Sequence, residues 1–234
     1  MMSFSLQFVL VLIGTFMIAL VLTPLVRLFS FKIDAVDYPN ARRINTKPMP
    51  SAGGLSIVIA FSIATLVFIP MLTSTTAPIK SYLSYTLPVV GAGWIIALTG
   101  LIDDVKELSA KKKMIGILLA ASLVWFLTDF RLNDFKIPFG GPLLHFEPWL
   151  SYLLTVIWIV AITNAVNLID GLDGLVSGVS IISLVTMGIV SYFFLPVPNL
   201  FLTMTIFVLV ASIAGFFPFN YHPAILYLGD TGAL

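Results

Sequence analysis

Long apolar runs, most of them about the length needed to cross a bilayer as a helix, fill most of the chain. A membrane-spanning helix needs roughly 20 apolar residues. The run at 114–128 is short, but it can extend back through its lysines, whose long side chains reach the membrane surface. The pattern predicts an all-α, polytopic membrane protein with about seven to eight transmembrane helices. The runs lie at residues 4–30, 51–71, 84–102, 114–128, 149–166, 175–195 and 200–217, with an eighth beginning near residue 224.

The composition agrees with this pattern. Of the 234 residues, 59% are hydrophobic and only 10% are charged, whereas a soluble domain carries about 25% charged residues. Neither an internal repeat nor a linker interrupts the runs. We therefore expect residues 1–234 to form a single transmembrane domain.

The connections between seven spans alternate between the two membrane sides. Residues 31–50, 103–113, 164–174 and 218–230 share one side, and the remaining connections share the other. Basic residues are enriched in cytoplasmic loops, and nine lie on the first side against three on the second. The first side is therefore predicted to be cytoplasmic. The nine are Arg27, Lys32, Arg42, Arg43, Lys47, Lys106, Lys111, Lys112 and Lys113; the three are Lys80, Arg131 and Lys136.

The outer connection at 130–141 alternates apolar and polar residues before a Gly140-Gly141 pair. Such alternation followed by a turn signal predicts a short β-hairpin. The alternative is an ordinary surface connection, which is the commoner role of a loop.

Carboxylates gather at the edges of the predicted cytoplasmic connections. Asp103 and Asp104 end one apolar run, Asp170 and Asp173 follow another, and Asp230 follows Leu-Gly. Acids this close to lipid-seeking residues are costly in a bilayer unless they face a polar cavity. A single such acid can be a helix cap or an interfacial anchor, but three separate groups on one side favour a shared site.

The segment from residue 164 to residue 174 carries a polar stripe. Asn164 and Asn167 are three residues apart, and Asp170 follows after three more, so all three share one face of a helix. Gly171 next permits a turn that presents Asp173. Amides have no reason to line a lipid face, so the stripe should face protein or water.

The chemistry points to a hard cation. The chain has no cysteine, so a metal would be held by oxygen ligands or by histidine, and carboxylates with open positions suit Mg²⁺, with Mn²⁺ as the alternative. His145 falls on the outer side, and a structural hydrogen bond is the favoured role of His222 over that of ligand or base. Lys111–Lys113 could meet phosphate or simply anchor the chain at the membrane. The net charge of +1 argues against a nucleic-acid partner.

These motifs, in this order, resemble the bacterial polyprenyl-phosphate N-acetylhexosamine-1-phosphate transferase family, of glycosyltransferase 4 type. The twelve residues 164–175 are the most specific part of the likeness, whereas an Asp-Asp pair alone would be weak. Asn220 and the residues after it look closest to the undecaprenyl-phosphate N-acetylglucosamine-1-phosphate transferases. The matching stretches are Asp103-Asp104, residues 164–175, residues 222–232, residues 39–43 and Gly53-Gly54.

The resemblance implies a function. The family transfers a sugar-1-phosphate from a UDP-sugar to a polyprenyl phosphate, releases UMP and requires Mg²⁺. We therefore expect N-acetylglucosamine-1-phosphate transfer from UDP-N-acetylglucosamine to undecaprenyl phosphate, the first membrane step of a cell-wall polymer such as teichoic acid or of O-antigen. The expected location is the bacterial inner (plasma) membrane, with a cytoplasmic active site. The family has further C-terminal helices, which residues 1–234 are expected to lack.

The resemblance also implies roles for individual residues. Asn167 and Asp230 match the metal ligands, while Asp103, Asp104 and Lys113 match the catalytic positions. Whether Asp103 acts as a base or positions other groups stays open, because a phosphate monoester is largely dianionic at neutral pH. The expected substrate-binding residues are Lys47, Asn164, Asp170, Gly171, Leu172, Asp173, Asn220 and Tyr227.

Other functions are also compatible with parts of this pattern. Within the family, the alternative is the phospho-N-acetylmuramoyl-pentapeptide transferase of peptidoglycan synthesis. Outside it, a cation-coupled transporter would also carry intramembrane acids, although transporter sites lie near the midplane, often between repeated halves. A non-catalytic scaffold would leave the Asn/Asp stripe unexplained. A homodimer is left open.

Overall fold

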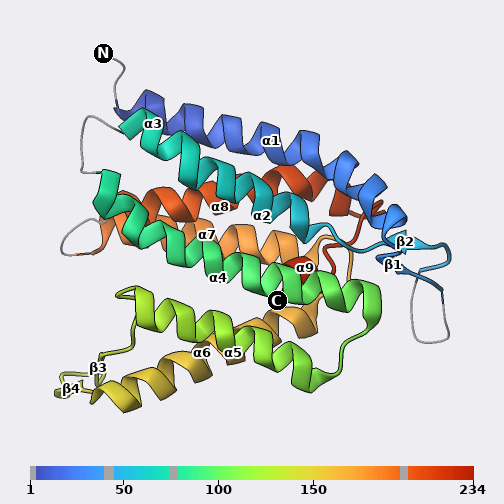
Figure 1. Ribbon diagram of the computed structural model, residues 1–234. Helices are drawn as coiled ribbons and strands as arrows, with labels where there is room; N and C mark the ends of the chain where they lie inside the picture. Colours follow the sequence, from blue (N-terminus) through green and yellow to red (C-terminus); the bar gives the residue numbers. More distant parts are fainter. Residues whose placement is uncertain (1–3, 40–44, 74–78, 196–199) are drawn as a thin grey trace.

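The protein is a bundle of long helices, and the computed structural model describes residues 4–39, 45–73, 79–195 and 200–234. All seven predicted apolar runs lie in helices (Figure 1). In order, these are α1 (Phe4–Lys32), the continuous rod of α2 (Gly54–Ile63), the π-helical turn η1 (Ala64–Phe68) and α3 (Ile69–Thr73), then α4 (Ile79–Lys106), α5 (Ala110–Leu127), α6 (Pro148–Ile169), α7 (Leu175–Phe193) and α8 (Leu200–Asn220).

Six of these rods in the described part of the chain are long and apolar enough to cross a membrane. The exception is α5, which is 18 residues long but begins with Lys111, Lys112 and Lys113. Its remaining residues run alongside α4 and α6 (Figure 1). The prediction of a polytopic helical membrane protein is thus confirmed.

The predicted eighth span near residue 224 is wrong. Residues 221–229 form an irregular segment, and only a short helix, α9 (Asp230–Ala233), follows. The segment is held by backbone hydrogen bonds at the start of α2: Tyr227 N–H donates to Pro50 O (2.9 Å), and Gly54 N–H donates to Leu228 O (2.9 Å). Its apolar residues fill the protein core, because Leu226 and Leu228 are buried with Phe216 of α8. The run is apolar for packing rather than for contact with lipid.

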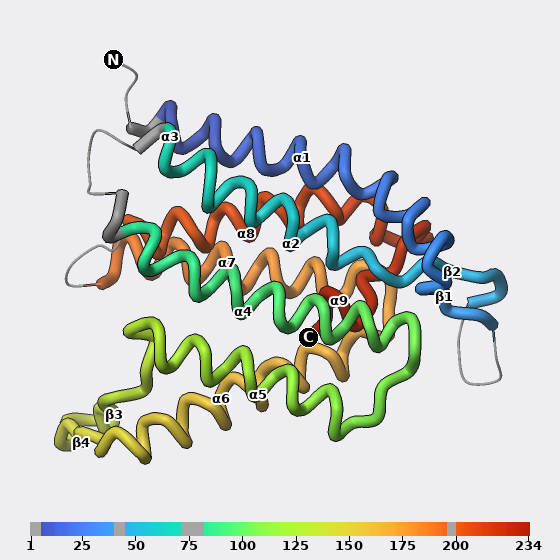
Figure 2. The backbone as a smooth tube through the Cα atoms, viewed as in Figure 1, coloured from blue at the N-terminus to red at the C-terminus, as the bar shows by residue number. Residues whose placement is uncertain are grey.

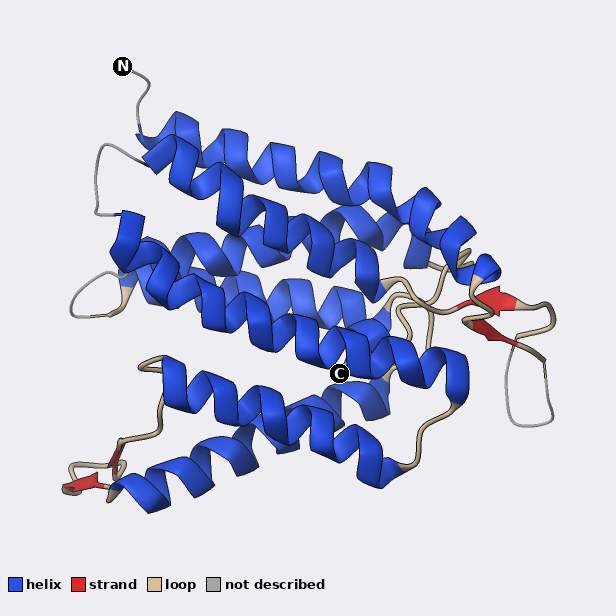
Figure 3. Cartoon of the chain, viewed as in Figure 1, coloured by secondary structure: helices blue, strands red, loops and turns tan. Residues whose placement is uncertain are grey.

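Two small hairpins mark opposite ends of the bundle (Figure 3). At one end β1 (Val36–Asp37) pairs with β2 (Met49–Pro50), and at the other β3 (Asp134–Lys136) pairs with β4 (Leu143–His145), both antiparallel. The second pair confirms the hairpin predicted for the outer connection. The loops predicted to share a side with the acids do lie together at the β1–β2 end.

The short helix α9 lies inside the bundle rather than at its edge. In the tube view it sits between α4 and α6 (Figure 2). Gly100 of α4 permits this approach, because a Cβ at Gly100 would lie 2.2 Å from Asp230 O. Gly229, with a φ of +71°, turns the chain into α9, and a Cβ there would lie 1.5 Å from Ser51 O. The first contact places Asp230 against α4, and the second places Gly229 against Ser51, just before α2.

Candidate active site

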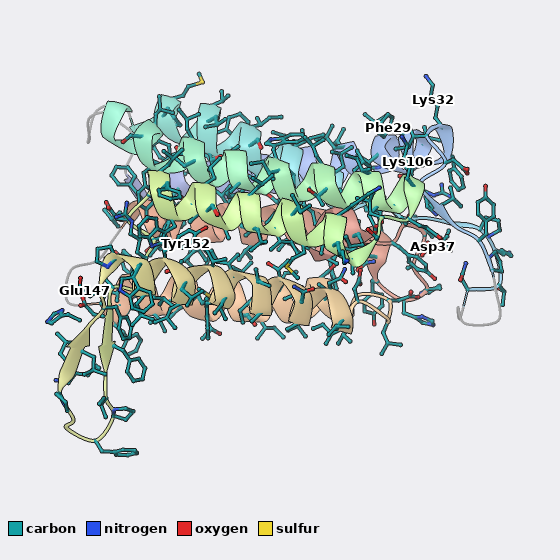
Figure 4. The ribbon with its side chains drawn as sticks, turned by 60° about the horizontal axis from the view of Figure 1, so that its bottom comes forward. Phe29, Lys32, Asp37, Lys106, Glu147 and Tyr152 are labelled. Atoms are coloured by element: carbon teal, nitrogen blue, oxygen red, sulfur yellow. The ribbon has the colours of Figure 1, made fainter. Side chains whose placement is uncertain are left out.

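A large cavity opens at the end of the bundle that carries β1 and β2. Its volume is about 1070 Å³, and it is lined by the β1–β2 connection, the end of α6, the residues just after α6 and the segment before α9. Asp37 and Lys106 mark this end in Figure 4, whereas Glu147 and Tyr152 mark the other. The three predicted groups of acids therefore meet at one end of the molecule.

Lys113 joins two of these acids. Its Nζ atom donates to Asp230 Oδ2 at 2.6 Å and also contacts Asp103 Oδ2. Asn167 of α6 donates its amide to the other oxygen of Asp230. Side chains from α4, α5, α6 and α9 thus converge on one point, and four of the residues assigned by resemblance are brought together.

Asp103 is the most buried of these acids, at 6% exposure. It lies in the last turns of α4, and its Oδ1 accepts the backbone N–H of Leu108 at 2.5 Å, just beyond the end of the helix. This bond fixes one carboxylate oxygen. The other oxygen remains directed at Lys113.

Asp104 has a different role from its neighbour. Its Oδ1 accepts the backbone N–H of Asp230 at 2.8 Å, and its Oδ2 accepts the N–H and the hydroxyl of Thr231 at 3.0 and 2.5 Å. The carboxylate therefore satisfies the free N–H groups at the start of α9. Sequence reasoning missed Thr231, although it stands in the Gly-Asp-Thr-Gly motif.

The charge state of the acids at the cavity reflects their neighbours. Burial alone would raise the pKa of the Asp230 carboxyl, but hydrogen bonds from its neighbours, Lys113 and Asn167 among them, hold it below the ordinary value. Burial raises the pKa of Asp170 to about 6, and the negative charges of Asp230 and Asp37 add to the effect. The site thus concentrates negative charge that a bound cation would offset.

Most of the predicted substrate-binding residues line the cavity. They include Lys47, Asp170, Gly171, Leu172, Asp173, Asn220 and Tyr227.

Two of these side chains are also held by the fold. Asp173 Oδ2 accepts the Ala224 N–H at 3.0 Å and pairs with His222 Nδ1 at 2.9 Å, which confirms a structural hydrogen bond for that histidine. Asn220 is 4% exposed; its oxygen accepts the Ser177 hydroxyl and its nitrogen donates to Leu226 O. Asn220 therefore shapes the wall and leaves little of its amide free for a ligand.

The predicted polar stripe is only partly realised. Asn167 and Asp170 reach the cavity, but Asn164 is absent from its wall and donates back to Val160 O at 2.7 Å within α6. Asp170 lies just beyond the helix, with φ −78° and ψ 58°. An amide that bonds its own helix can remain in an apolar surrounding without a ligand.

Two further residues support the wall and were not predicted from the sequence to belong to the site. Asn45 donates to Asp37 O at 2.8 Å and to Lys47 O at 2.9 Å, which closes the loop that carries Lys47. Arg27 of α1 donates to Ile225 O at 3.1 Å. Residues 40–44, which hold most of the resembling stretch 39–43, including Arg42 and Arg43, lie outside the described residues.

The residues at this point suit a hard cation. Lys113 Nζ is a positive charge between two carboxylates, and a rotation of the Asn167 amide would turn its oxygen toward the same point. In the described residues no three acids or histidines converge on one position. Mg²⁺ commonly takes one or two carboxylates and completes its shell with water and substrate phosphates, so the fit is good.

The fold and the site together define a class of protein. The chain is a helical membrane protein in which acids, an amide and a lysine converge at one end, as they do in a membrane enzyme. The sequence pattern of glycosyl transferase family 4 matches residues 86–234. The chain belongs to this family.

The named relatives agree with this family assignment. The chain is 38% identical over 229 residues to the probable undecaprenyl-phosphate N-acetylglucosaminyl 1-phosphate transferase of Bacillus subtilis, covering 97% of this chain and 60% of that protein. It is 34% identical to the phospho-N-acetylmuramoyl-pentapeptide-transferase of Staphylococcus saprophyticus, covering 97% of this chain and 71% of that protein. A decaprenyl-phosphate N-acetylglucosaminephosphotransferase of Mycolicibacterium smegmatis is 32% identical, over 89% of this chain and 52% of its own length. The chain thus spans just over half of two of these relatives.

Proposed function

We propose that the protein transfers N-acetylglucosamine-1-phosphate from UDP-N-acetylglucosamine to undecaprenyl phosphate, with release of UMP. The observation that carries the proposal is the convergence of Asp103, Lys113, Asn167 and Asp230 beside a cavity of about 1070 Å³. A cavity of this size accommodates a nucleotide sugar. The 38% identity to a relative named for the same transfer supports the choice of substrates.

The nucleotide would occupy the part of the cavity that is lined by Gly171, Asp173 and Tyr227. Gly171 lets the backbone approach a flat base closely, since no atom lies within 4 Å of a Cβ placed there. The Asp173 carboxylate can accept hydrogen bonds from the uracil edge, and Tyr227 can cover its face. Lys47, exposed at the rim, can reach the nucleotide.

The diphosphate would then extend toward Lys113 and Asp230. A phosphate oxygen of the lipid attacks the phosphorus that bears the sugar, a new phosphorus–oxygen bond forms, and the bond to UMP breaks. Lys113 would hold phosphate oxygens, and Asp103 and Asp230, which contact its Nζ atom, would orient that ammonium group. Mg²⁺ held by Asn167 and Asp230 would neutralise the diphosphate and help to align the reactants. No base is needed to deprotonate a phosphate dianion.

The competing functions predict different arrangements. A cation-coupled transporter would place its acids near the middle of the bundle, whereas Asp103 lies in the last turns of α4 and Asp170 just beyond the end of α6. The phospho-N-acetylmuramoyl-pentapeptide transferase shares the same chemistry, so the donor sugar distinguishes the two.

A donor comparison tests the proposal. The full-length protein is given undecaprenyl phosphate, Mg²⁺ and either UDP-N-acetylglucosamine or UDP-N-acetylmuramoyl-pentapeptide, and labelled UMP is measured. We expect release with the first donor and none above background with the second. The opposite preference would move the protein to the other branch, and no release with either donor would overturn the transferase proposal.

The cytoplasmic position of the site leads to a labelling prediction. Ser109, exposed between α4 and α5, is changed to Cys in a chain that has no native cysteine. We expect an impermeant thiol reagent to label it only after intact cells are opened. Lys136→Cys in the β3–β4 hairpin is the matched control and should react in intact cells. Labelling in the reverse order would contradict the assigned orientation.

A nucleotide-binding prediction concerns Asp173. Asp173→Ala should weaken UMP binding by about 1.5 to 3 kcal/mol, the usual loss for a hydrogen bond to a charged group. His222→Ala is the control, because it removes the partner of Asp173 in the wall but leaves the carboxylate. Calorimetric titration with UMP and Mg²⁺ would measure both. Equal losses in the two variants would mean that the loop, and not the carboxylate, holds the base.

A further inference from the structure

The β3–β4 hairpin, at the end of the bundle away from the cavity, has two unlike faces. Its register pairs Phe135 with Leu144, and Asp134 with His145. Neighbouring residues of a strand point to opposite faces, so the first pair and the second pair lie on opposite sides. The second pair is joined by an Asp134 Oδ1 to His145 Nδ1 contact of 2.5 Å. Leu143, paired with Lys136, also lies on the second face and is 48% exposed, so that face is mixed, whereas the first face is apolar. The hairpin is therefore amphipathic.

The apolar face has no cover from the described protein. Phe135 is 52% exposed and Leu144 is 41% exposed, while Phe139 at the turn is fully exposed. Ile137, two residues after Phe135, lies on the same face and is 36% exposed. A two-stranded hairpin alone is marginally stable in water, so its apolar side needs a partner.

The direction of the hairpin indicates which partner. In Figure 4 it leaves the bundle near Glu147 and extends sideways, across the direction of the helices and past α6. On α6 itself Trp149, Ile157 and Trp158 are 68%, 54% and 60% exposed. Because α6 is long and apolar enough to cross a membrane, such exposed apolar side chains suit a lipid surrounding. A membrane crossed by these helices has its surface across their direction, so the hairpin runs along that surface.

The base of the hairpin is fixed, so this direction is built into the fold. Arg131 donates to Trp125 O at 2.8 Å and lies over the Trp125 ring, 4.7 Å from its centre. Ser151 of α6 donates to Asn133 Oδ1 at 2.9 Å, and Leu132 N–H donates to Thr155 Oγ1 at 3.0 Å. These bonds tie the strand to both α5 and α6.

We propose that the β3–β4 hairpin lies in the headgroup region of the bilayer leaflet opposite the active site. Phe135, Ile137 and Leu144 face the acyl chains, and the Asp134–His145 pair faces water. Amphipathic segments bury their apolar face about 5–10 Å deep in this region. Aromatic residues such as Trp149 concentrate at the same level. A hairpin this small lacks the roughly 800 Å² per partner of a stable protein interface, which favours lipid over a second copy.

Single-cysteine probes test the placement, since the chain has no cysteine of its own. Leu144→Cys and Lys136→Cys, on opposite faces, each receive an environment-sensitive fluorophore. The full-length protein is placed at one copy per nanodisc of phosphatidylcholine and phosphatidylglycerol. We expect blue-shifted emission and quenching by doxyl-labelled lipid at Leu144, and several-fold stronger quenching by iodide at Lys136. One copy per disc excludes cover by a second chain.

Two outcomes would overturn the proposal. Equal iodide quenching at both sites would place the whole hairpin in water. A Leu144 probe shielded from iodide but not quenched by doxyl lipid would mean that protein, and not lipid, covers the apolar face. Neither result depends on catalysis, so the hairpin proposal can fail while the proposed transfer stands.

Discussion

Replacing Asp230 by Asn is expected to lower UMP release by about 10³-fold or more. The Asp230 carboxylate meets Lys113 through one oxygen and Asn167 through the other, so the substitution removes negative charge at the centre of the site. Metal and charge interactions of this kind supply several kcal/mol in a transition state, and each 1.36 kcal/mol corresponds to about tenfold in rate. Steady-state UMP release measures the effect.

A second measurement separates metal binding from general damage. Mn²⁺ binding, followed by electron paramagnetic resonance, should weaken together with turnover in Asp230→Asn. Asp34→Asn is the matched control, because Asp34 is an exposed acid at the same end of the bundle that accepts only the Tyr38 hydroxyl in the contacts described, at 2.9 Å. Unchanged Mn²⁺ affinity in Asp230→Asn would remove Asp230 from the metal site.

The sequence predicted the membrane helices well because apolar runs of about 20 residues leave few alternatives. It failed at residues 224–229 because hydropathy does not distinguish a segment that faces lipid from one buried in protein. Leu226 and Leu228 are 0% and 3% exposed, and the backbone around them pairs with residues before α2. Such pairing between distant segments is not encoded in a local pattern.

The sequence predicted that the acids gather at one end of the molecule, but not which partner each side chain contacts. The sequence placed Asp103 and Asp104 together, yet their carboxylates point to different partners, Lys113 and the start of α9. Helical spacing put Asn164 beside Asn167, but Asn164 bonds its own helix. Spacing gives the face of a helix on which a residue lies and leaves open which partner its side chain reaches.

Asp104 is therefore expected to act through Asp230 rather than on the substrate. Asp104→Ala leaves two backbone N–H groups and the Thr231 hydroxyl without their acceptor, and each unsatisfied group costs about 1–3 kcal/mol. Helix α9 should shift, and a displacement of about 1 Å at a reacting group can cost roughly 10²-fold in rate. We expect a loss of UMP release of about that size, with weaker Mn²⁺ binding.

The Asn variant distinguishes this positioning role from direct chemistry. Asp104→Asn keeps one oxygen to accept the Asp230 N–H, which lies 2.8 Å from Asp104 Oδ1. Its amide can donate to the Thr231 hydroxyl, but the Thr231 N–H loses its acceptor. The Asp104→Asn variant should release UMP roughly tenfold faster than Asp104→Ala, because it restores part of the hydrogen bonding at the start of α9. Thr231→Ala, which removes one donor alone, should cost less than Asp104→Ala. If Asp104 were instead a base, the Asn and Ala variants would be equally inactive, and the Mn²⁺ affinity would stay unchanged in both. The pair of substitutions therefore distinguishes a residue that touches the substrate from one that holds Asp230 in place.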